Sequence, residues 1–519
     1  MSQKITTPYA LELKGIDKRF GTVHANRAID LKVEKGTIHG IVGENGAGKS
    51  TLMSIIYGFY QADAGEMFID GQPFVAKDSK AAIDAGIGMV HQHFMLIHNF
   101  TVLENVILGA ESSPLLNPSM REARAALKRL EQDYNLQVPL DTQVQDLPVG
   151  IQQRVEILKA LYRGAKVLIL DEPTGVLTPQ ETDHLFKVLA ALRDQGTTII
   201  IITHKLREIL AVTNNVSVMR QGEMVAHLVT KNTTREELAE QMVGRKVLLR
   251  VTKGEAEPQQ ELLRAEQLSF TDKHGVPRLK NLNFAVRAGE IVGVAGVSGN
   301  GQSQLLEVLS GMKAPTSGSF TYGDTLISAD APRDAEQIRK LKVAHVPEDR
   351  HSQGLVTAMM ASEAFILGYH RDPQYNHRIF LKQKEVVADC AKQMKKWDVR
   401  PPIPDLKTAN FSGGNQQKLV LAREVERDPD VMLIGQPTRG VDIGAIEFIH
   451  QQIIALRDQG KAILLVSVEL EEILSLSDRI LVMFDGEIVA EVDASEANER
   501  MLGLMMANAH GEDEVHDAS

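Results

Sequence analysis

Residues 43–51 read GENGAGKST, and this stretch decides how the chain is expected to fold. It matches the pattern G-x-x-x-x-G-K-[ST] and follows the apolar run TIHGIVG, residues 37–43. A short apolar run is typical of a strand buried on both faces of a parallel sheet, and a helix is expected after the glycines. Glycines let backbone N–H groups turn inward around phosphate oxygens. The stretch therefore predicts a phosphate-binding loop.

Two side chains at the end of this loop have the chemistry that a bound nucleotide needs. Lys49 is expected to reach the β- and γ-phosphates, and the Ser50 hydroxyl is expected to bind Mg²⁺. Chance is the competing explanation, because average composition produces the pattern in roughly one chain in fifty of this length. The expected strand before the loop and the expected helix after it make chance the weaker explanation.

A second segment, VLILDEPTGVLT (167–178), contains a strand that ends in two carboxylates. Asp171 is expected to hold the Mg²⁺ shell, and Glu172 is placed to orient or deprotonate the attacking water. Two carboxylates at the end of a buried strand are costly unless they serve a cation, which argues against a structural role. Gln92 in VHQHF and His204 in IITHK are weaker signals on their own.

The chain contains two copies of one unit. LKVEKGTIHGIVGENGAGKSTL is matched by FAVRAGEIVGVAGVSGNGQSQLL, and TTIIIITHKLREIL is matched by KAILLVSVELEEIL. Gly296 lies 253 residues after Gly43, and Gly435 lies 264 residues after Asp171, so the second copy is 11 residues longer between these motifs. Apolar runs alternate with helical patterns, which indicates an α/β fold. Buried helices are the alternative, but the runs are short and rich in β-branched residues.

The repeat divides the chain into two domains joined by a polar segment. We expect the first domain over residues 8–245 and the second over residues 262–506. The polar stretch RVTKGEAEPQQE lies in the expected linker, residues 246–261. Residues 507–519 are acidic and lack apolar anchors, so we expect a flexible tail.

The composition is that of a globular protein in a reducing compartment. The 519 residues are 43% apolar, and the net charge of −11 gives no field that would draw the chain to nucleic acid. The single cysteine, Cys390, lies in a helical pattern and is expected to be a packing residue. No apolar run approaches the roughly 18–20 residues that span a bilayer, and the start of the chain lacks signal-peptide features. We expect a soluble, cytoplasmic protein whose membrane role needs a partner chain.

The order of the motifs resembles a known family. The glycine loop, Gln92, QQRVEILKAL, LILDEPT and THKLREI together resemble the nucleotide-binding domain of ABC transporters. The second half, with GVSGNGQS, VPEDR and SGGNQQK, resembles the fused two-domain ATPase of bacterial importers for simple sugars and nucleosides. HQHFMLIHNFTVLENVILG and QPTRGVDIGAIEFIH are most similar to the nucleoside branch. The resemblance covers about residues 8–505.

The resemblance implies a fold and an arrangement of sites. It implies two tandem P-loop NTPase domains, each with a mainly parallel core sheet, an antiparallel β-subdomain and a helical subdomain. In that family two domains pack head to tail, and each ATP lies between the phosphate loop of one domain and the signature segment of the other, usually LSGGQ. Phe20, in KRFG, would stack on adenine, although from the sequence alone it could equally be a core aromatic.

The resemblance also implies the residues of the ATP and Mg²⁺ sites. Gln92 would link the nucleotide to the membrane subunit, and His204 would contact the γ-phosphate. The expected catalytic residues are Lys49, Gln92, Glu172 and His204, and the expected Mg²⁺ ligands are Ser50, Gln92 and Asp171. The residues expected to bind ATP are Phe20, Gly43, Asn45, Gly46, Gly48, Lys49, Ser50, Thr51, Ser412, Gly413, Gly414, Gln416 and Asp442.

The two copies depart from the family pattern in opposite ways. The second copy loses the catalytic groups but keeps the signature SGGNQQ, residues 412–417, whereas the first copy keeps them and has PVGIQQ, residues 148–153. If the copies pair head to tail, all intact parts fall in one site, so we expect one hydrolytic and one non-hydrolytic site. The residues of the second copy that match Lys49, Gln92, Asp171, Glu172 and His204 are Gln302, Glu348, Gly435, Gln436 and Val468.

The resemblance implies an ATP-hydrolysing motor subunit of an ABC importer, with nucleosides as the expected cargo and a simple sugar, of the ribose or galactose type, as the alternative. Its expected partners are integral membrane permease subunits and an extracytoplasmic substrate-binding protein, with no nucleic acid. The chain would sit at the cytoplasmic face of the cell membrane, attached only through the permease. A soluble twin ATPase acting on ribosomes or DNA is the other alternative, but the linker is short and one site has lost its catalytic groups.

Overall fold

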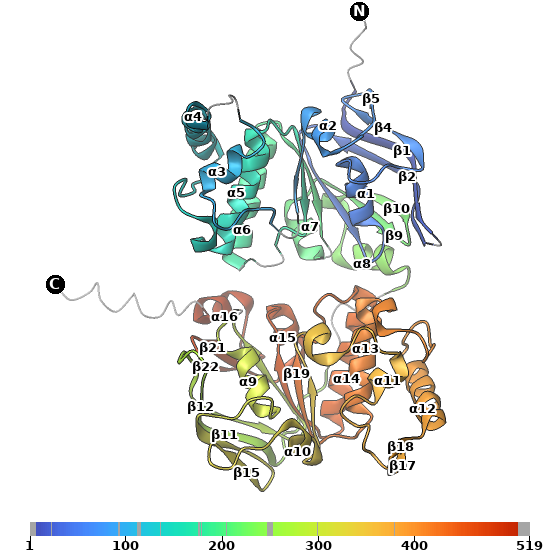
Figure 1. Ribbon diagram of the computed structural model, residues 1–519, viewed down its shortest axis with the longest axis vertical. Helices are drawn as coiled ribbons and strands as arrows, with labels where there is room; N and C mark the ends of the chain where they lie inside the picture. Colours follow the sequence, from blue (N-terminus) through green and yellow to red (C-terminus); the bar gives the residue numbers. More distant parts are fainter. Residues whose placement is uncertain are drawn as a thin grey trace, which may run out of the picture. The chain divides into compact units, whose positions relative to one another are not determined.

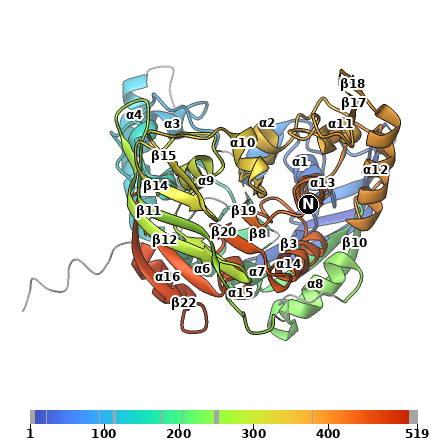
Figure 2. The same ribbon diagram turned by 90° about the horizontal axis from the view of Figure 1, so that it is seen from below.

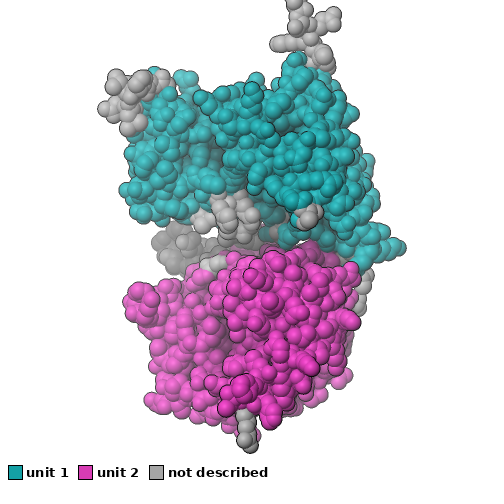
Figure 3. Space-filling view, turned by 45° about the vertical axis from the view of Figure 1, so that its right-hand side comes forward, with its two compact units in different colours: residues 1–247 teal, residues 248–519 magenta. Residues whose placement is uncertain are grey.

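The computed structural model divides the chain into two compact units, Met1–Val247 and Leu248–Ser519 (Figures 1 and 3). No helix in the described part of the chain is long and apolar enough to cross a membrane. The structure describes residues 7–21, 23–91, 94–111, 116–134, 136–174, 177, 179–203, 205–246, 253–297, 299–377 and 379–506.

A six-stranded sheet forms the centre of unit 1, in the order β10-β9-β3-β8-β7-β6. Strands β3, β6, β7, β8 and β9 are parallel, and β10 pairs with β9 in the antiparallel sense. The bounds are β3 (Ile38–Gly43), β6 (Ile87–Val90), β7 (Val167–Asp171), β8 (Thr198–Ile202), β9 (Asn215–Arg220) and β10 (Glu223–Val229).

Both faces of this sheet are covered, which explains its continuous apolar runs. Along β8, Ile199 and Ile201 pack in one apolar cluster, while Ile200 and Ile202 pack in another on the opposite face. The first cluster includes helices α3 (Val102–Ile107), α4 (Leu116–Tyr134), α5 (Val149–Tyr162) and α6 (Pro179–Asp194). The second includes α1 (Lys49–Ile56), α2 (Ser79–Asp84) and the smaller sheet. The remaining helices are α7 (Leu206–Val212) and α8 (Arg235–Val243).

The smaller sheet of unit 1 is antiparallel and has the order β2-β1-β4-β5. Its first strand alternates buried and more exposed side chains, with Leu11 and Leu13 facing the core, as expected for a sheet covered on one face. The strands are β1 (Tyr9–Phe20), β2 (Val23–Glu34), β4 (Ala64–Ile69) and β5 (Gln72–Phe74).

Unit 2 repeats this plan with sheets ordered β16-β19-β20-β13-β21-β22 and β12-β11-β14-β15. The four-stranded sheet and helices α11–α13 lie on opposite sides of the central strands in both views (Figures 1 and 2). Its strands are β11 (Glu261–Thr271), β12 (Pro277–Arg287), β13 (Glu290–Ala295), β14 (Ser317–Tyr322), β15 (Thr325–Ser328), β16 (Val343–Val346), β17 (Asn376–His377), β18 (Phe380–Leu381), β19 (Val431–Gly435), β20 (Ala462–Val466), β21 (Arg479–Phe484) and β22 (Glu487–Asp493).

The helices of unit 2 complete the correspondence with unit 1. They are α9 (Gln302–Leu309), α10 (Ala335–Lys340), α11 (Ala361–Phe365), α12 (Gln383–Lys396), α13 (Gly413–Val425), α14 (Ile443–Asp458), α15 (Leu470–Leu476) and α16 (Glu499–Met506). Cys390 is buried in the core of this unit. The predicted α/β class, with a mainly parallel core sheet, an antiparallel β-subdomain and a helical subdomain in each unit, is confirmed.

Part of the segment expected to be a linker makes contacts within unit 2. The Lys253 ammonium donates to the Asp478 carboxylate at 3.1 Å. The Arg457 guanidinium donates to the carbonyl of Gly254 at 3.1 Å. Residues 253 and 254 are therefore anchored on unit 2, while the expected tail, residues 507–519, lies outside the described residues.

Unit 1 contains three polar side chains linked by hydrogen bonds, of which His39 and Ser217 are buried and His227 is exposed. His39 Nε2 lies 2.8 Å from Ser217 Oγ, which lies 2.8 Å from His227 Nδ1, and His39 Nδ1 has no hydrogen-bond partner. Burial, with a smaller effect of His227, lowers the pKa of His39 to about 4. At the matching register of unit 2 the residues are Val292 and Leu481. His39 must therefore be neutral in the folded unit and becomes charged only on unfolding at acidic pH.

We predict that unit 1 loses stability as the pH falls from 6.5 to 4. In this window the unfolded chain binds a proton at His39 that the folded chain does not, so the free energy of unfolding falls by up to about 3 kcal/mol. His39→Val should remove this loss. The measurement is guanidinium unfolding at several pH values by far-UV circular dichroism.

Trp397 is the single tryptophan and lies in unit 2, so its fluorescence reports the unfolding transition of unit 2 separately from that of unit 1. His274→Gln, at an exposed histidine of unit 2, is the control and should leave the acid dependence of unit 1 unchanged. An equally steep acid dependence in His39→Val would contradict the prediction.

Candidate nucleotide-binding sites

The predicted phosphate loop of unit 1 joins β3 to α1, and its path is set by close neighbours. Gly48 has φ 99°, and a Cβ there would lie 2.2 Å from the carbonyl oxygen of Ala25, so only glycine fits. The buried side chain of Asn26 donates from Nδ2 to the Gly48 carbonyl at 3.1 Å. Asn26 was not singled out from the sequence, because its contact depends on how β2 packs beside the loop.

Three of the predicted catalytic and metal-binding side chains of unit 1 lie within electrostatic reach of one another. Lys49 is buried, and its ammonium donates to the carbonyls of Gly43 at 2.7 Å and Glu44 at 3.0 Å. Burial lowers the pKa of Lys49, and the charges of Glu172, Asp171 and Glu44 oppose this effect. The sheet therefore brings the carboxyl end of β7 next to the loop that follows β3.

The two carboxylates at the end of β7 are held in an unfavourable arrangement. Burial, and then the charge of Glu172, raises the pKa of Asp171 to about 6, although Lys49 acts in the opposite direction. Glu172 has φ 50°, a left-handed conformation, and its N–H donates to the carbonyl of Ile202 at 2.8 Å. A non-glycine residue in this conformation costs about 1 kcal/mol or more.

The donors present in unit 1 fit ATP and Mg²⁺. Mg²⁺ prefers hard oxygen ligands and is usually held by one or two carboxylates together with substrate phosphates. Asp171 and Ser50 can supply these oxygens, and no group of three or more His, Cys, Asp or Glu that could hold a metal alone is found among the described residues. The predicted residues Gln92 and His204 lie outside the described residues, so their positions stay predictions.

Phe20 lies at the end of β1 with 42% of its surface exposed, so it is not part of the core. Its ring makes an edge-on contact with Tyr60 at 5.1 Å between centroids, and the Lys18 ammonium lies 5.5 Å from the ring centre. An exposed aromatic ring of this kind can stack on a nucleotide base. Tyr60, which is also exposed, was not singled out from the sequence.

Unit 2 has a glycine loop of similar shape with different side chains. The hydroxyl of Ser303 donates to the carboxylate of Glu348. Burial raises the pKa of Glu348, while the Ser303 hydrogen bond and the charge of Arg439 lower it. Gln436, which replaces Glu172, has φ 47°, and its side-chain oxygen accepts from the N–H of Val468 at 3.3 Å.

The predicted signature residues of unit 2 come together at the start of α13. Ser412 caps this helix and accepts from the Asn415 side chain at 2.8 Å. A Cβ at Gly414 would lie 2.9 Å from the Asp442 carboxylate, which in turn caps α14. In unit 1 the cap of α5 is Pro148, which makes no side-chain cap hydrogen bond.

Two residues that follow β16 in the sequence, Arg350 and His351, contact this signature segment. Gln416 is buried and donates from Nε2 to the carbonyl of Thr408 at 2.9 Å, and its Oε1 lies 2.8 Å from His351 Nε2. The guanidinium of Arg350 donates to the carbonyl of Arg439 at 2.6 Å. The amide of Gln416, expected to contact ATP, is thus engaged within unit 2. From the sequence, Arg350 could be noticed only as part of the motif VPEDR, and its contacts could not be predicted.

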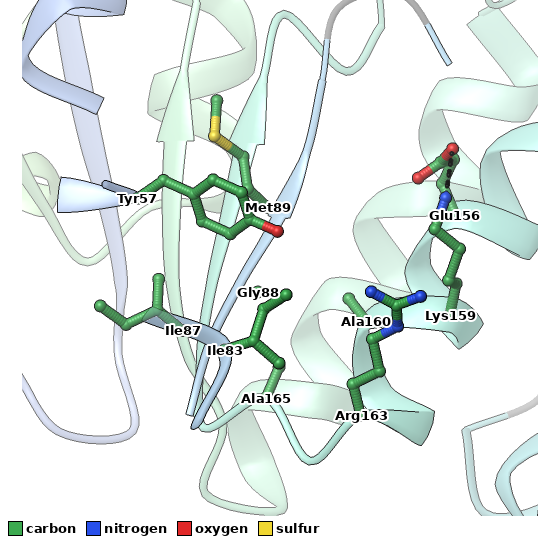
Figure 4. Close-up of a pocket in the computed structure, with 10 residues that line it drawn as sticks. All are labelled: Tyr57, Ile83, Ile87, Gly88, Met89, Glu156, Lys159, Ala160, Arg163 and Ala165. Atoms are coloured by element: carbon green, nitrogen blue, oxygen red, sulfur yellow. Dashed lines mark hydrogen bonds and ion pairs between the residues drawn. The ribbon is translucent and has the colours of Figure 1, made fainter. Parts of the chain in front are cut away.

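Unit 1 also has a shallow hollow between β6 and α5, shown in Figure 4. Tyr57 and Met89 lie on one side of it, and Glu156 and Lys159 on α5, with Arg163 directly after the helix, lie across from them. Lys159 pairs with Glu156 at 3.2 Å. The hollow is separate from the phosphate loop and carries both apolar and charged groups, so it is suited to a protein contact rather than to phosphate binding.

Comparison with known proteins places these features in a family. A model of the ABC transporter family matches residues 27–175 and 279–439, one match in each unit. The nucleoside import ATP-binding protein NupA of Lactococcus lactis subsp. cremoris (strain MG1363) is 42% identical over 96% of this chain and 98% of its own length. The guanosine import ATP-binding protein NupO of Bacillus subtilis (strain 168) is 43% identical, with the same coverage.

A third relative is named for a different cargo. The glucose import ATP-binding protein TsgD13 of Haloferax volcanii (strain ATCC 29605) is 42% identical over 96% of this chain and 95% of its own length. These relatives are similar over nearly their whole length, and the family model covers the phosphate loop of each unit. The chain therefore belongs to the ABC transporter family, as an ATPase subunit with two ATP-binding units in one polypeptide.

Proposed function

We propose that this chain is the ATP-hydrolysing motor of an importer for nucleosides. The observation that carries the proposal is the group formed by Lys49, Asp171 and Glu172, which are coupled electrostatically in unit 1. Two of the relatives carry names of nucleoside and guanosine import proteins. A simple sugar is the second candidate cargo, because an equally similar relative is a glucose import protein.

Hydrolysis is assigned to one composite site. In this proposal the phosphate loop of unit 1 and the signature of unit 2, Ser412 to Gly414 with Asp442, enclose one ATP. Lys49 neutralises phosphate charge, and Glu172 orients the attacking water or accepts its proton. Asp171 and Ser50 hold Mg²⁺, with Gln92, and the ion supplies positive charge at the phosphates. His204 contacts the γ-phosphate, and Phe20 stacks on adenine.

The proposed partners are permease subunits in the membrane and an extracytoplasmic substrate-binding protein. The chain would be attached at the cytoplasmic face of the membrane through the permease alone. The hollow beside α5 supports a permease contact, because it is lined by Met89 of β6, three residues before Gln92 in the sequence. Tyr57 contacts the rings of Phe59 and His91 there, with centroids 5.2 and 5.9 Å apart, and Phe59 is 51% exposed.

Glu172→Gln should lower ATP hydrolysis by at least about 100-fold, because the general base is lost. Gln436→Ala should change the rate less than about twofold, since the matching position of unit 2 has no base to lose. Phosphate release by the chain with its permease is the measurement. Uptake of labelled nucleosides, ribose, galactose and glucose in cells with each variant then identifies the cargo. Equal losses in both variants would contradict a single hydrolytic site.

Asp171→Asn should stabilise the nucleotide-free chain while abolishing hydrolysis. The raised pKa of Asp171 means that its charged form costs folding free energy above pH 6, so the amide should add about 1–3 kcal/mol at pH 7.5. Below pH 4 the folded and unfolded chains both carry the protonated acid, so the gain should vanish. Guanidinium unfolding at both pH values tests this, and a pH-independent effect would contradict it.

Phe59→Asp should abolish uptake while leaving nucleotide binding intact. The ring is exposed and lies beside the hollow, so a charge there would oppose an apolar contact without disturbing the core. Val75→Asp is the matched control, because Val75 is exposed elsewhere on unit 1. Co-purification with the permease and uptake are measured together. Normal uptake with Phe59→Asp would place the permease contact on another surface.

A further inference from the structure

A buried carboxylate of unit 1 contacts both of the loops that carry its predicted reacting groups. Glu208 lies in the first turn of α7 and is 7% exposed. One loop follows β7 and begins with Glu172, and the other follows β8 and contains His204. A buried carboxylate is costly unless hydrogen bonds satisfy its oxygens, so its partners indicate what it holds.

Each of the two loops donates one hydroxyl hydrogen bond to Glu208. In the first loop, the hydroxyl of Thr174, two residues after Glu172, donates to Oε1. In the second loop, the hydroxyl of Thr203 donates to Oε2 at 3.3 Å. The Thr203 oxygen also accepts from the N–H of Lys205 at 3.0 Å, so it links the residues on both sides of position 204. Glu208 therefore bridges the two loops through one side chain.

Unit 2 keeps the carboxylate but joins it to different partners. At the matching position, Oε1 of Glu472 accepts from the hydroxyl of Thr438 at 2.7 Å, as Glu208 does from Thr174. The same oxygen lies 2.9 Å from Nε2 of His450 on α14. Its Oε2 has no hydrogen-bond partner among the residues that the structure describes. The bridge to the loop after the next strand is therefore found in the unit that has the catalytic groups.

The contacts of Glu208 indicate that it acts through the loops and not on ATP itself. Burial raises the pKa of Glu208, the charge of Lys205 and the two hydroxyl hydrogen bonds lower it, and the charge of Glu172 raises it. The carboxylate is thus close enough to Glu172 for their charges to interact. Because both of its oxygens accept from hydroxyls of unit 1, it is engaged within the unit.

We infer that Glu208 is a positioning residue for ATP hydrolysis, which fixes the loop of Glu172 relative to the loop of His204 by bridging Thr174 and Thr203. A general base must lie within hydrogen-bond reach of its water, and a displacement of about 1 Å can cost about 100-fold in rate. The inference rests on the proposed function, because it requires that Glu172 and His204 act on one ATP.

The test compares Glu208→Ala with Glu472→Ala in the chain with its permease. Phosphate release is measured over a range of ATP concentrations. Glu208→Ala should lower kcat at least about tenfold and change KM for ATP less than about threefold, because the bridge holds the reacting groups and not the phosphate loop. Glu472→Ala is the matched control, since it removes a carboxylate of similar burial, 5% exposed, from the same place in the fold. It should change kcat less than about twofold, whereas a merely structural role would affect both variants alike.

Two further variants separate the bridge from charge and from folding. Glu208→Gln keeps the shape of the side chain, and its amide can accept one hydroxyl hydrogen bond and donate the other, so it should keep at least about a third of the rate. Thr203→Val keeps the volume of the side chain, so it carries the test by itself if Glu208→Ala does not fold. It should lower kcat at least about threefold, and adding it to Glu208→Ala should lower kcat by less than a further factor of about two.

A normal kcat in Glu208→Ala or in Thr203→Val would overturn the inference. An equal loss in Glu472→Ala, a loss in Glu208→Gln as large as in Glu208→Ala, or a loss that lies in KM alone would also overturn it. Glu172→Gln judges the proposed function separately. Fast hydrolysis by Glu172→Gln would contradict the proposed function, whereas slow hydrolysis by Glu172→Gln together with a normal Glu208→Ala would overturn this inference alone.

Discussion

The charges of Lys49, Asp171 and Glu172 interact in a largely buried space at one edge of a parallel sheet, and the first site depends on this arrangement. The strand order carries β3 and β7 to the same edge with β8 between them, so residues far apart in the sequence become neighbours. Burial disfavours the charged form relative to the neutral form in both Lys49 and Asp171. The glycine loop, its close contact with Ala25 and the left-handed turn at Glu172 hold these groups in place despite that cost.

Comparing the two units separates what the fold requires from what the chemistry requires. The sheet order and the positive φ values of the loop glycines recur in both, whereas the charged groups do not. The signature helix of unit 2 begins at a serine cap supported by Arg350 and Gln416, and the matching helix of unit 1 begins at a proline. The two units therefore share a fold but differ in the side chains at the matching positions.

The sequence was enough to predict the fold and the phosphate loop, because both rest on local patterns. Runs such as TTIIIIT bury the side chains on both faces of a strand, which requires a sheet covered on both sides. Position 48 must be glycine because a Cβ there would clash with the carbonyl oxygen of Ala25. The place of Glu348 could not be predicted, since it depends on the packing of two segments 87 residues apart, at Glu348 and Gly435. The contacts of the Gln416 amide could not be predicted either, because a glutamine in a polar motif looks the same whether it faces a ligand or other residues of its own unit.

The left-handed residue after the central strand has a consequence for how such proteins diverge. Glu172 and Gln436 have φ values of 50° and 47°, and each donates its N–H to the neighbouring strand, at Ile202 and Val466. The unusual backbone thus persists where the acid is gone, so it belongs to the architecture of the sheet edge and not to catalysis. Selection can exchange the side chain at this point by a single substitution while the backbone stays as it was inherited. A change of side chain at this position therefore needs no rebuilding of the sheet edge.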